Sequence, residues 1–310
     1  IAAINGTGNT ANNTLIGNEA DNSLQGGAGN DTLNGEAGAD TLVGGDGSDT
    51  YYVDNAGDVV TETNANAKVG GSDWVITSLS AYTLGANVEA GRILSAGSAN
   101  LTGNALNNWL YAGAGDNVLD GGAGSDTASY NFAATGVTVS LAITGAQSTG
   151  GSGSDTLINF ENLYGSKYND TLTGKAAGNA LYGDSGNDTL NGGAGADTLV
   201  GGTGNDTFVL ASVTDTGITK GTWDVITDFV SGTDKIDLSA IDASTLTAGD
   251  QAFGSLTVGG TFSGAFAATA SLYYDNVARV LYGNNDADAQ ADFAIALTGV
   301  TTLLMTDLIV

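Results

Sequence analysis

The sequence predicts an all-β chain built from a short repeat, and three observations carry that prediction. A nine-residue phrase, G-G-x-G-x-D-x-U-x with U large and apolar, occurs in fourteen near-matches along the 310 residues. The chain contains 49 Gly and no Pro, so no residue is present that would interrupt a backbone hydrogen-bonding ladder. Segments outside the phrase, such as "DWVITSL" and "YTLGANVEAGRIL", alternate apolar and polar residues as strands do.

The repeats fall into blocks separated by inserts. The first block starts at Gly8 and its sixth positions change from Asn to Asp, ending in "GGAGNDTLN", "GEAGADTLV" and "GGDGSDTYY". A second block starts at Gly103, a lone copy "GGSGSDTLI" follows, and a third block starts at Gly165. The predicted segments are residues 1–52 (first roll block), 53–102 (β-rich insert), 103–129 (second block), 130–164 (insert with the lone repeat), 165–209 (third block) and 210–310 (C-terminal cap).

The eighth position of each repeat supplies the expected core. It is Leu in most copies and Tyr51 or Phe208 at the ends of the first and third blocks. In the inserts, "VTVSLAI" and the stretch from Phe293 to Leu297 also have strand-like patterns. Glu62, Glu89, Arg92 and Glu161 are isolated in the sequence, and we expect them to have surface or capping roles.

Composition excludes several function classes. A net charge of −27 with only 7 Lys and Arg argues against nucleic acid or an anionic membrane as a partner. The absence of His and Cys removes Ser-His-Asp chemistry, zinc-protease sites, disulfides and thiolate metal sites. We therefore expect no enzymatic activity, and a metal site built only from oxygen ligands remains open.

The termini carry further expectations. The first fifteen residues lack the basic start and apolar core of a signal peptide, and residues 293–306 are too few for a membrane helix. Because the chain begins inside the repeat pattern, we expect it to be part of a longer protein.

The residue types of the phrase suit a calcium site. Glycines tolerate positive φ and let carbonyl groups converge without an intervening Cβ. A flexible cage of six to eight carbonyl and carboxylate oxygens is what Ca²⁺ prefers, whereas Mg²⁺ requires a stricter octahedron. Two aspartates stacked at the strand spacing of about 5 Å repel by about 3 kcal/mol at an effective dielectric of about 20. One buried apolar side chain per repeat is a thin core, so we expect the fold to need several Ca²⁺ ions as cofactor.

The repeats resemble the RTX family of haemolysin-type calcium-binding proteins, whose nonapeptides form a right-handed parallel β-roll solenoid. The resemblance implies that the first six residues form a turn, that x-U-x forms a strand with U inward, and that two nonapeptides complete a coil. The region from residue 210 resembles the C-terminal region of serralysin-type proteins, in which two aspartates complete the last calcium site, here Asp215 and Asp224. The end of the chain, Asp307 to Val310, resembles an uncleaved type I secretion signal; a last β-strand is the plainer interpretation, and both are compatible.

The predicted metal ligands combine sixth-position carboxylates with turn residues. They are Gly26, Ala28, Asp31, Gly35, Ala37, Asp40, Gly44, Asp46, Asp49, Asp126, Asp155, Asp170, Gly183, Ser185, Asp188, Gly192, Ala194, Asp197, Gly201, Thr203 and Asp206, together with Asp215 and Asp224. We expect the sixth-position asparagines to keep the turn shape with weak or no metal binding. The stretch "NNDADAQAD" resembles an EF-hand loop through Asp286, Asp288 and Asp292 but lacks the turn glycine, so metal binding there is left open.

The expected function is a calcium-binding module that folds on export into calcium-rich surroundings. It would carry the type I secretion signal of a larger extracellular or cell-surface protein, with the secretion machinery as a transient partner. The alternative is a building block of a surface layer, adhesin or filament, in which self-association is the function. Carboxylate-pair sugar chemistry and ice binding are weaker alternatives, because most aspartates lie in turns and a regular Thr/Asn array is missing.

Overall fold

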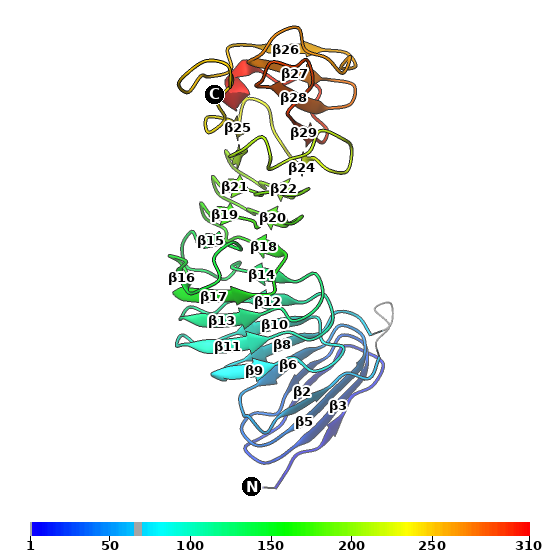
Figure 1. Ribbon diagram of the computed structural model, residues 1–310. Helices are drawn as coiled ribbons and strands as arrows, with labels where there is room; N and C mark the ends of the chain where they lie inside the picture. Colours follow the sequence, from blue (N-terminus) through cyan, green and yellow to red (C-terminus); the bar gives the residue numbers. More distant parts are fainter. Residues whose placement is uncertain (1, 65–69) are drawn as a thin grey trace. The chain divides into compact units, whose positions relative to one another are not determined.

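The computed structural model describes residues 2–64 and 70–310, and its contacts divide the chain into two units. Unit 1 comprises Ile1–Ala134 and Thr144–Phe160, and unit 2 comprises Thr135–Ile143 and Glu161–Val310. Both units consist of short strands joined by turns (Figure 1). Among the described residues, no helix is both long and apolar enough to cross a bilayer.

Unit 1 contains strand stacks built from alternate half-coils, with one antiparallel pair, Gln147–Ser148 against Ser154–Asp155, among otherwise parallel ones. One stack has the order β1 (Gly6–Thr7), β3 (Ser23–Ala28), β5 (Thr41–Asp46) and β7 (Val59–Thr61). A second has the order β2 (Thr14–Ile16), β4 (Thr32–Asn34), β6 (Thr50–Val53), β8 (Trp74–Thr77), β10 (Ala90–Ile93), β12 (Trp109–Tyr111) and β14 (Thr127–Ser129). A third has the order β16 (Gln147–Ser148), β17 (Ser154–Ile158), β13 (Asn117–Asp120), β11 (Ala99–Thr102) and β9 (Ala81–Thr83).

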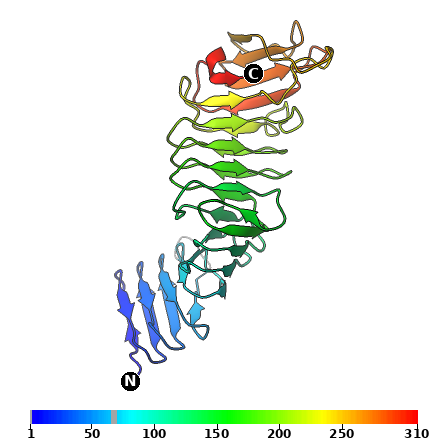
Figure 2. The same cartoon turned by 90° about the vertical axis from the view of Figure 1, so that its left-hand side faces the viewer.

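Unit 2 also begins with stacks of parallel strands, but it ends in a group of antiparallel strands. One stack runs β15 (Thr138–Ser140), β19 (Thr171–Thr173), β21 (Thr189–Asn191), β23 (Thr207–Val209), β25 (Lys235–Asp237) and β30 (Leu308–Ile309). The other runs β18 (Asn162–Tyr164), β20 (Ala180–Tyr182), β22 (Thr198–Val200), β24 (Asp224–Ile226), β29 (Phe293–Leu297), β28 (Val280–Asn284), β27 (Ser271–Asp275) and β26 (Leu256–Gly259). A short 3₁₀ turn, η1 (Met305–Asp307), precedes β30. Figure 2 shows the green-to-yellow strands of this unit stacked one on another.

The strand register confirms the predicted β-roll. Leu33 pairs with Tyr51 in parallel, and Leu172 pairs with Leu190, so equivalent positions two nonapeptides apart lie side by side. Eighth-position side chains point inward and are buried in every block, because alternate residues of a strand face opposite sides. They include Leu24, Leu33, Leu42, Tyr51, Leu110, Leu119, Leu157, Leu172, Leu181, Leu190, Leu199 and Phe208.

The C-terminal cap departs from the roll. Strands β27, β28 and β29 pair antiparallel, whereas β24 and β29 pair in parallel and attach the cap to the last coils. The predicted strand within "VTVSLAI" is shorter than the pattern suggests and covers only Thr138–Ser140. Residues 293–297 form the expected strand.

Candidate metal centres in the turns

Sixth-position side chains form hydrogen-bonded ladders along each unit. In unit 1, Asp49 Oδ1 accepts the N–H of Asp31 at 2.7 Å. In unit 2, the Oδ1 atoms of Asp188 and Asp206 accept the N–H groups of Asp170 and Asp188 at 2.7 and 2.9 Å. Each bond spans 18 residues, which is one coil. One carboxylate oxygen per aspartate is therefore used to tie successive turns together.

The glycines at the first position make room for these carboxylates. A Cβ built on Gly26 would collide with Asp31 Oδ2, and one on Gly192 would collide with the Asp197 carboxylate. Glycine is needed at the fourth position because of the backbone angle. Gly195, for example, has a φ of 146°, which residues with a Cβ rarely adopt. Glycine at these places thus brings the turn backbone against the carboxylate of its own repeat.

Within the part of the chain that the structure describes, the second carboxylate oxygen of several repeats is buried without a hydrogen-bond donor. The side chains that share this feature are Asp31, Asp40, Asp49, Asp188 and Asp197, each exposed by no more than 1%. A buried carboxylate oxygen without a partner is costly. Oxygen ligands surrounded by turn backbone fit Ca²⁺, which coordinates carboxylates and carbonyls. The residues present therefore fit the ion that the repeat pattern predicts.

The electrostatics of the turns also favour a cation. Burial raises the pKa of Asp197 to about 6 and that of Asp188 to about 7, while backbone N–H bonds oppose the change. The charges of Asp170 and Asp206 raise the pKa of Asp188 further. A bound cation acts in the opposite direction, because it favours the ionised carboxylate.

Asparagine at the sixth position forms hydrogen bonds through both the oxygen and the nitrogen of its side-chain amide. Asn179 Oδ1 accepts the N–H of Lys175 at 2.7 Å, and its Nδ2 donates to the Glu161 carbonyl at 2.8 Å. Asn108 similarly accepts from Asn104 and donates to the Val88 carbonyl. The amide nitrogen contacts backbone oxygen where a carboxylate could not, which is consistent with the expectation of weak or no metal binding at these positions.

The second block and the lone repeat also join the ladders. Asp126 Oδ1 accepts the N–H of Asn108 at 2.6 Å. Asp155 Oδ1 accepts the N–H of Asn117 at 2.8 Å across 38 residues, so the lone copy forms the coil that follows the second block. Burial raises the pKa of Asp155 to about 7, with a smaller opposing effect from the Tyr130 hydroxyl.

The two aspartates assigned by resemblance lie near the last repeats. Asp224 is 5% exposed, and its Oδ1 accepts the Asp197 N–H at 3.0 Å. Burial raises the pKa of Asp224 to about 8, and the charges of Asp197 and Asp215 add to this effect. The Asp215 carbonyl accepts the N–H of Gly195 at 2.9 Å. The structure thus brings Asp197, Asp215 and Asp224 together.

The remaining predicted residues occupy strand ends or turns. Gly26 and Ala28 lie in β3, and Gly44 and Asp46 lie in β5. The turn positions outside named strands are Gly35, Ala37, Gly183, Ser185, Gly192, Ala194, Gly201 and Thr203.

The carboxylates of the EF-hand-like loop accept hydrogen bonds from backbone N–H groups of the same loop. Asp286 and Asp288 each accept the N–H two residues onward, at 2.8 and 2.7 Å, and Asp292 accepts the Asn285 N–H at 2.7 Å. Burial raises the pKa of Asp292, and the charges of Asp286 and Asp288 raise it further. Metal binding there stays a prediction left open.

Several ladder carboxylates lie outside the phrase and were missed by the sequence reasoning. Asp58 accepts from Asp40, Asp73 from Asp49 and Asp234 from Asp206, at 3.0, 2.7 and 3.0 Å respectively. Each missed residue begins a D-x-U triplet, "DVV", "DWV" or "DKI", that keeps the last part of the repeat without the glycines of its first two positions. That half-motif is the signal that would have identified them.

The residues expected to be isolated have specific contacts instead. Glu62 is 6% exposed, and one of its carboxylate oxygens accepts the Tyr51 hydroxyl. Glu89 accepts the Asp73 N–H at 2.8 Å. The Arg92 guanidinium lies 3.5 Å from the centre of the Phe132 ring. Of the surface or capping role expected for Glu62, the surface part is therefore wrong, because its side chain is buried against Tyr51.

Comparison with solved structures gives matches of limited extent. The matches comprise 30 chains. One is the solution structure of the AlgE6R3 subunit from the Azotobacter vinelandii mannuronan C5-epimerase, 30% identical over 46% of this chain and 78% of that chain, with a TM-score of 0.28. At that TM-score the match adds nothing to the fold, which rests on the strand pairing. The search of curated proteins found no match.

Family models match both parts of the chain. The model for RTX calcium-binding nonapeptide repeats matches residues 7–42, 16–51, 28–60 and 95–128. The model for the peptidase M10 serralysin C terminal matches residues 133–310, more than half of the chain. These matches confirm the resemblance stated from the sequence, and they support calcium binding by the repeats. The chain belongs to the serralysin C-terminal family and carries RTX calcium-binding repeats ahead of that region.

Proposed function

We propose that this chain is a calcium-dependent folding and export module of a type I secreted extracellular protein, without chemistry of its own. The observation that carries the proposal is a set of buried carboxylate oxygens that have no donor among residues 2–64 and 70–310, at Asp31, Asp40, Asp49, Asp188 and Asp197. Extracellular calcium modules bind at about 10⁻⁴–10⁻³ M, far above cytosolic free calcium. The ladders would therefore stay open in the cell and close after export, where binding energy becomes folding energy.

The contacts of the C-terminal tail also favour export before folding. Asp307 is buried and accepts the Ser231 hydroxyl at 2.6 Å and the N–H groups of Gly232 and Leu304 at 2.9 Å each. Strand β30 pairs in parallel with β25. A secretion signal in this tail would be accessible to the export machinery only before unit 2 folds.

A calcium titration followed by circular dichroism tests the proposal. The metal-free chain at neutral pH is expected to lack most of its β signal and to gain it cooperatively as calcium rises toward the millimolar range. A metal-free chain that already shows the full β spectrum would refute the proposal. The export part is tested by secretion of the full chain with and without residues 307–310, with cytosolic retention of the shortened chain as the expected result.

The structural alternative, a surface-layer or filament building block, stays a prediction. Light scattering with and without calcium distinguishes it from the module. Calcium-dependent oligomers favour the building block, and a monomer at high protein concentration counts against it.

A further inference from the structure

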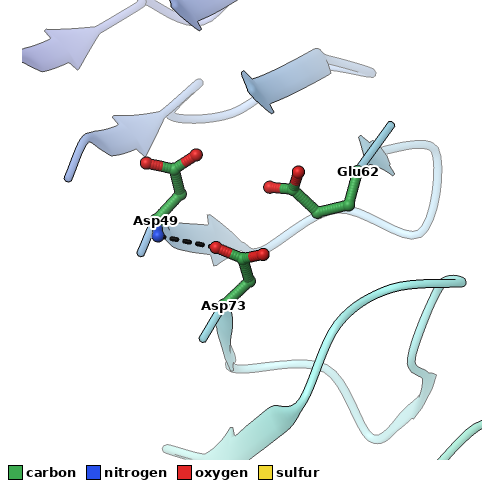
Figure 3. A group of neighbouring side chains, drawn as sticks. All are labelled: Asp49, Glu62 and Asp73. Carbon is green, nitrogen blue, oxygen red and sulfur yellow. Dashed lines mark hydrogen bonds between the residues drawn. The ribbon is translucent and has the colours of Figure 1, made fainter. Parts of the chain in front are cut away.

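Three buried carboxylates meet at the end of the first repeat block. Asp49 immediately precedes β6, Asp73 immediately precedes β8, and Glu62 directly follows β7. They are 0%, 1% and 6% exposed, and a carboxylate oxygen from each lies within 4.8 Å of the other two. Figure 3 shows the Glu62 carboxylate directed toward the two aspartates, with Asp49 N–H donating to Asp73 at 2.7 Å.

Two oxygens of this cluster are buried without a donor, and they provide an observation independent of the clustering. Asp49 Oδ2 and Glu62 Oε2 have no hydrogen-bond partner among the described residues. The neighbouring charges that act on the three carboxylates belong to other carboxylates, including Glu89. Burial raises the pKa of Glu62 to about 7 and that of Asp73 to about 8.

Tyr51 explains how Glu62 is positioned. It occupies the eighth position of the last repeat, where the other first-block repeats have leucine. The ring is fully buried, as are Leu24, Leu33 and Leu42, and its hydroxyl donates to Glu62 Oε1. This bond helps to hold the Glu62 carboxylate in the orientation that Figure 3 shows, toward the two aspartates.

We propose that Asp49, Glu62 and Asp73 bind one hard divalent cation, Ca²⁺ in calcium-rich surroundings, at a site in which only Asp49 belongs to a nonapeptide. Two of its three carboxylates come from the segment between the first and second blocks, and Glu62 enters from β7, which belongs to another strand stack. Asp73 follows Asp49 by 24 residues instead of 18. Carboxylates on side chains of different length suit the irregular oxygen shell of Ca²⁺ better than the octahedron of Mg²⁺.

The competing explanation is a cluster that holds protons instead of a metal ion. In that case the carboxyl groups share hydrogen bonds, and replacing Glu62 by its neutral isostere changes no ion count. The identity of the ion in this inference rests on the proposed calcium function. The test must therefore distinguish a failure of this site from a failure of that function.

Equilibrium dialysis against ⁴⁵Ca²⁺ at pH 7.5 gives that separation. Glu62→Gln is expected to bind one ion fewer than the wild-type chain, whereas Glu19→Gln, a change at an exposed carboxylate of the same unit, is expected to bind the full number. Equal counts for Glu62→Gln and wild type overturn this site and leave the repeat sites standing. A wild-type chain that binds no calcium overturns the proposed function itself.

A measurement on the unmodified chain covers the case in which Glu62→Gln does not fold. Crystals grown with calcium and exchanged into Tb³⁺ should show an anomalous peak in coordination contact with Asp49, Glu62 and Asp73. A map with peaks in the nonapeptide turns and none at this cluster overturns the inference.

Discussion

Replacing Asp188 by asparagine is expected to have opposite effects with and without calcium. Asp188 lies within the third block, is 1% exposed, and has one carboxylate oxygen without a donor. Burial raises its pKa from 3.8 to about 7, and one pKa unit corresponds to about 1.4 kcal/mol. The ionised side chain therefore costs about 4 kcal/mol in the metal-free fold, or about 2 kcal/mol after partial solvent screening is allowed for.

Asparagine fits this turn, since Asn179 occupies the equivalent place in the same block with both ends of its amide bonded. Without calcium, Asp188→Asn should therefore raise the free energy of unfolding by about 2 kcal/mol. With calcium at 100 times its dissociation constant, a lost site costs about 2.7 kcal/mol. In calcium, the free energy of unfolding of Asp188→Asn should therefore be slightly lower than that of the wild-type chain.

Urea unfolding followed by circular dichroism measures both effects. The metal-free samples contain EDTA and an osmolyte that populates the folded state, and the control is Asp250→Asn, at an exposed carboxylate. The control is expected to match the wild type in both conditions. An equal gain for Asp188→Asn with and without calcium would refute the reasoning, because the carboxylate would then have no role in ion binding.

Three further predictions concern pH, glycine and the tail. Because burial raises the pKa of carboxyls such as Asp224 to about 8, well above the unfolded value of about 4, their protonated form stabilises the metal-free fold at low pH. This stability is lost as pH rises through 6–8, so the β signal in EDTA should grow from pH 8 to pH 5; a signal that falls contradicts this. Gly192→Ala places a Cβ against the Asp197 carboxylate and should destabilise the calcium-bound fold by about 1–3 kcal/mol in thermal unfolding, whereas Gly260→Ala, in open space, should be neutral. Asp307→Ala leaves three donors unpaired and should lower stability by about 2–3 kcal/mol at pH 7, with an unchanged melting temperature as the contrary result.

The sequence was sufficient to predict the roll because its period is dictated by local chemistry. A buried leucine at every ninth position and glycines at fixed turn positions determine which residues face inward, and the pairing of Leu33 with Tyr51 follows from two repeats per coil. The inserts were less predictable, because their coils keep a D-x-U triplet such as "DWV" but lose the glycines of the first two repeat positions.

The carboxylates that the sequence reasoning missed depend on contacts between distant segments. Glu62 looks isolated in the sequence, yet it reaches Asp49 and Asp73 because β7 pairs with β5 and β8 pairs with β6. Tyr51 is the local sign of that contact, since a hydroxyl at an inward position requires a buried partner. The antiparallel pairing of β27, β28 and β29 likewise has no repeat to indicate it.

Amide hydrogen exchange tests most directly whether calcium closes the turns. The N–H groups of Asp31, Asp170 and Asp188 each donate to a carboxylate one coil away, so each reports whether its own turn is closed. We expect strong protection of these amides in calcium and exchange close to unfolded-chain rates in EDTA at pH 8. Equal protection in both conditions would contradict it, since the ladders would then stand without an ion.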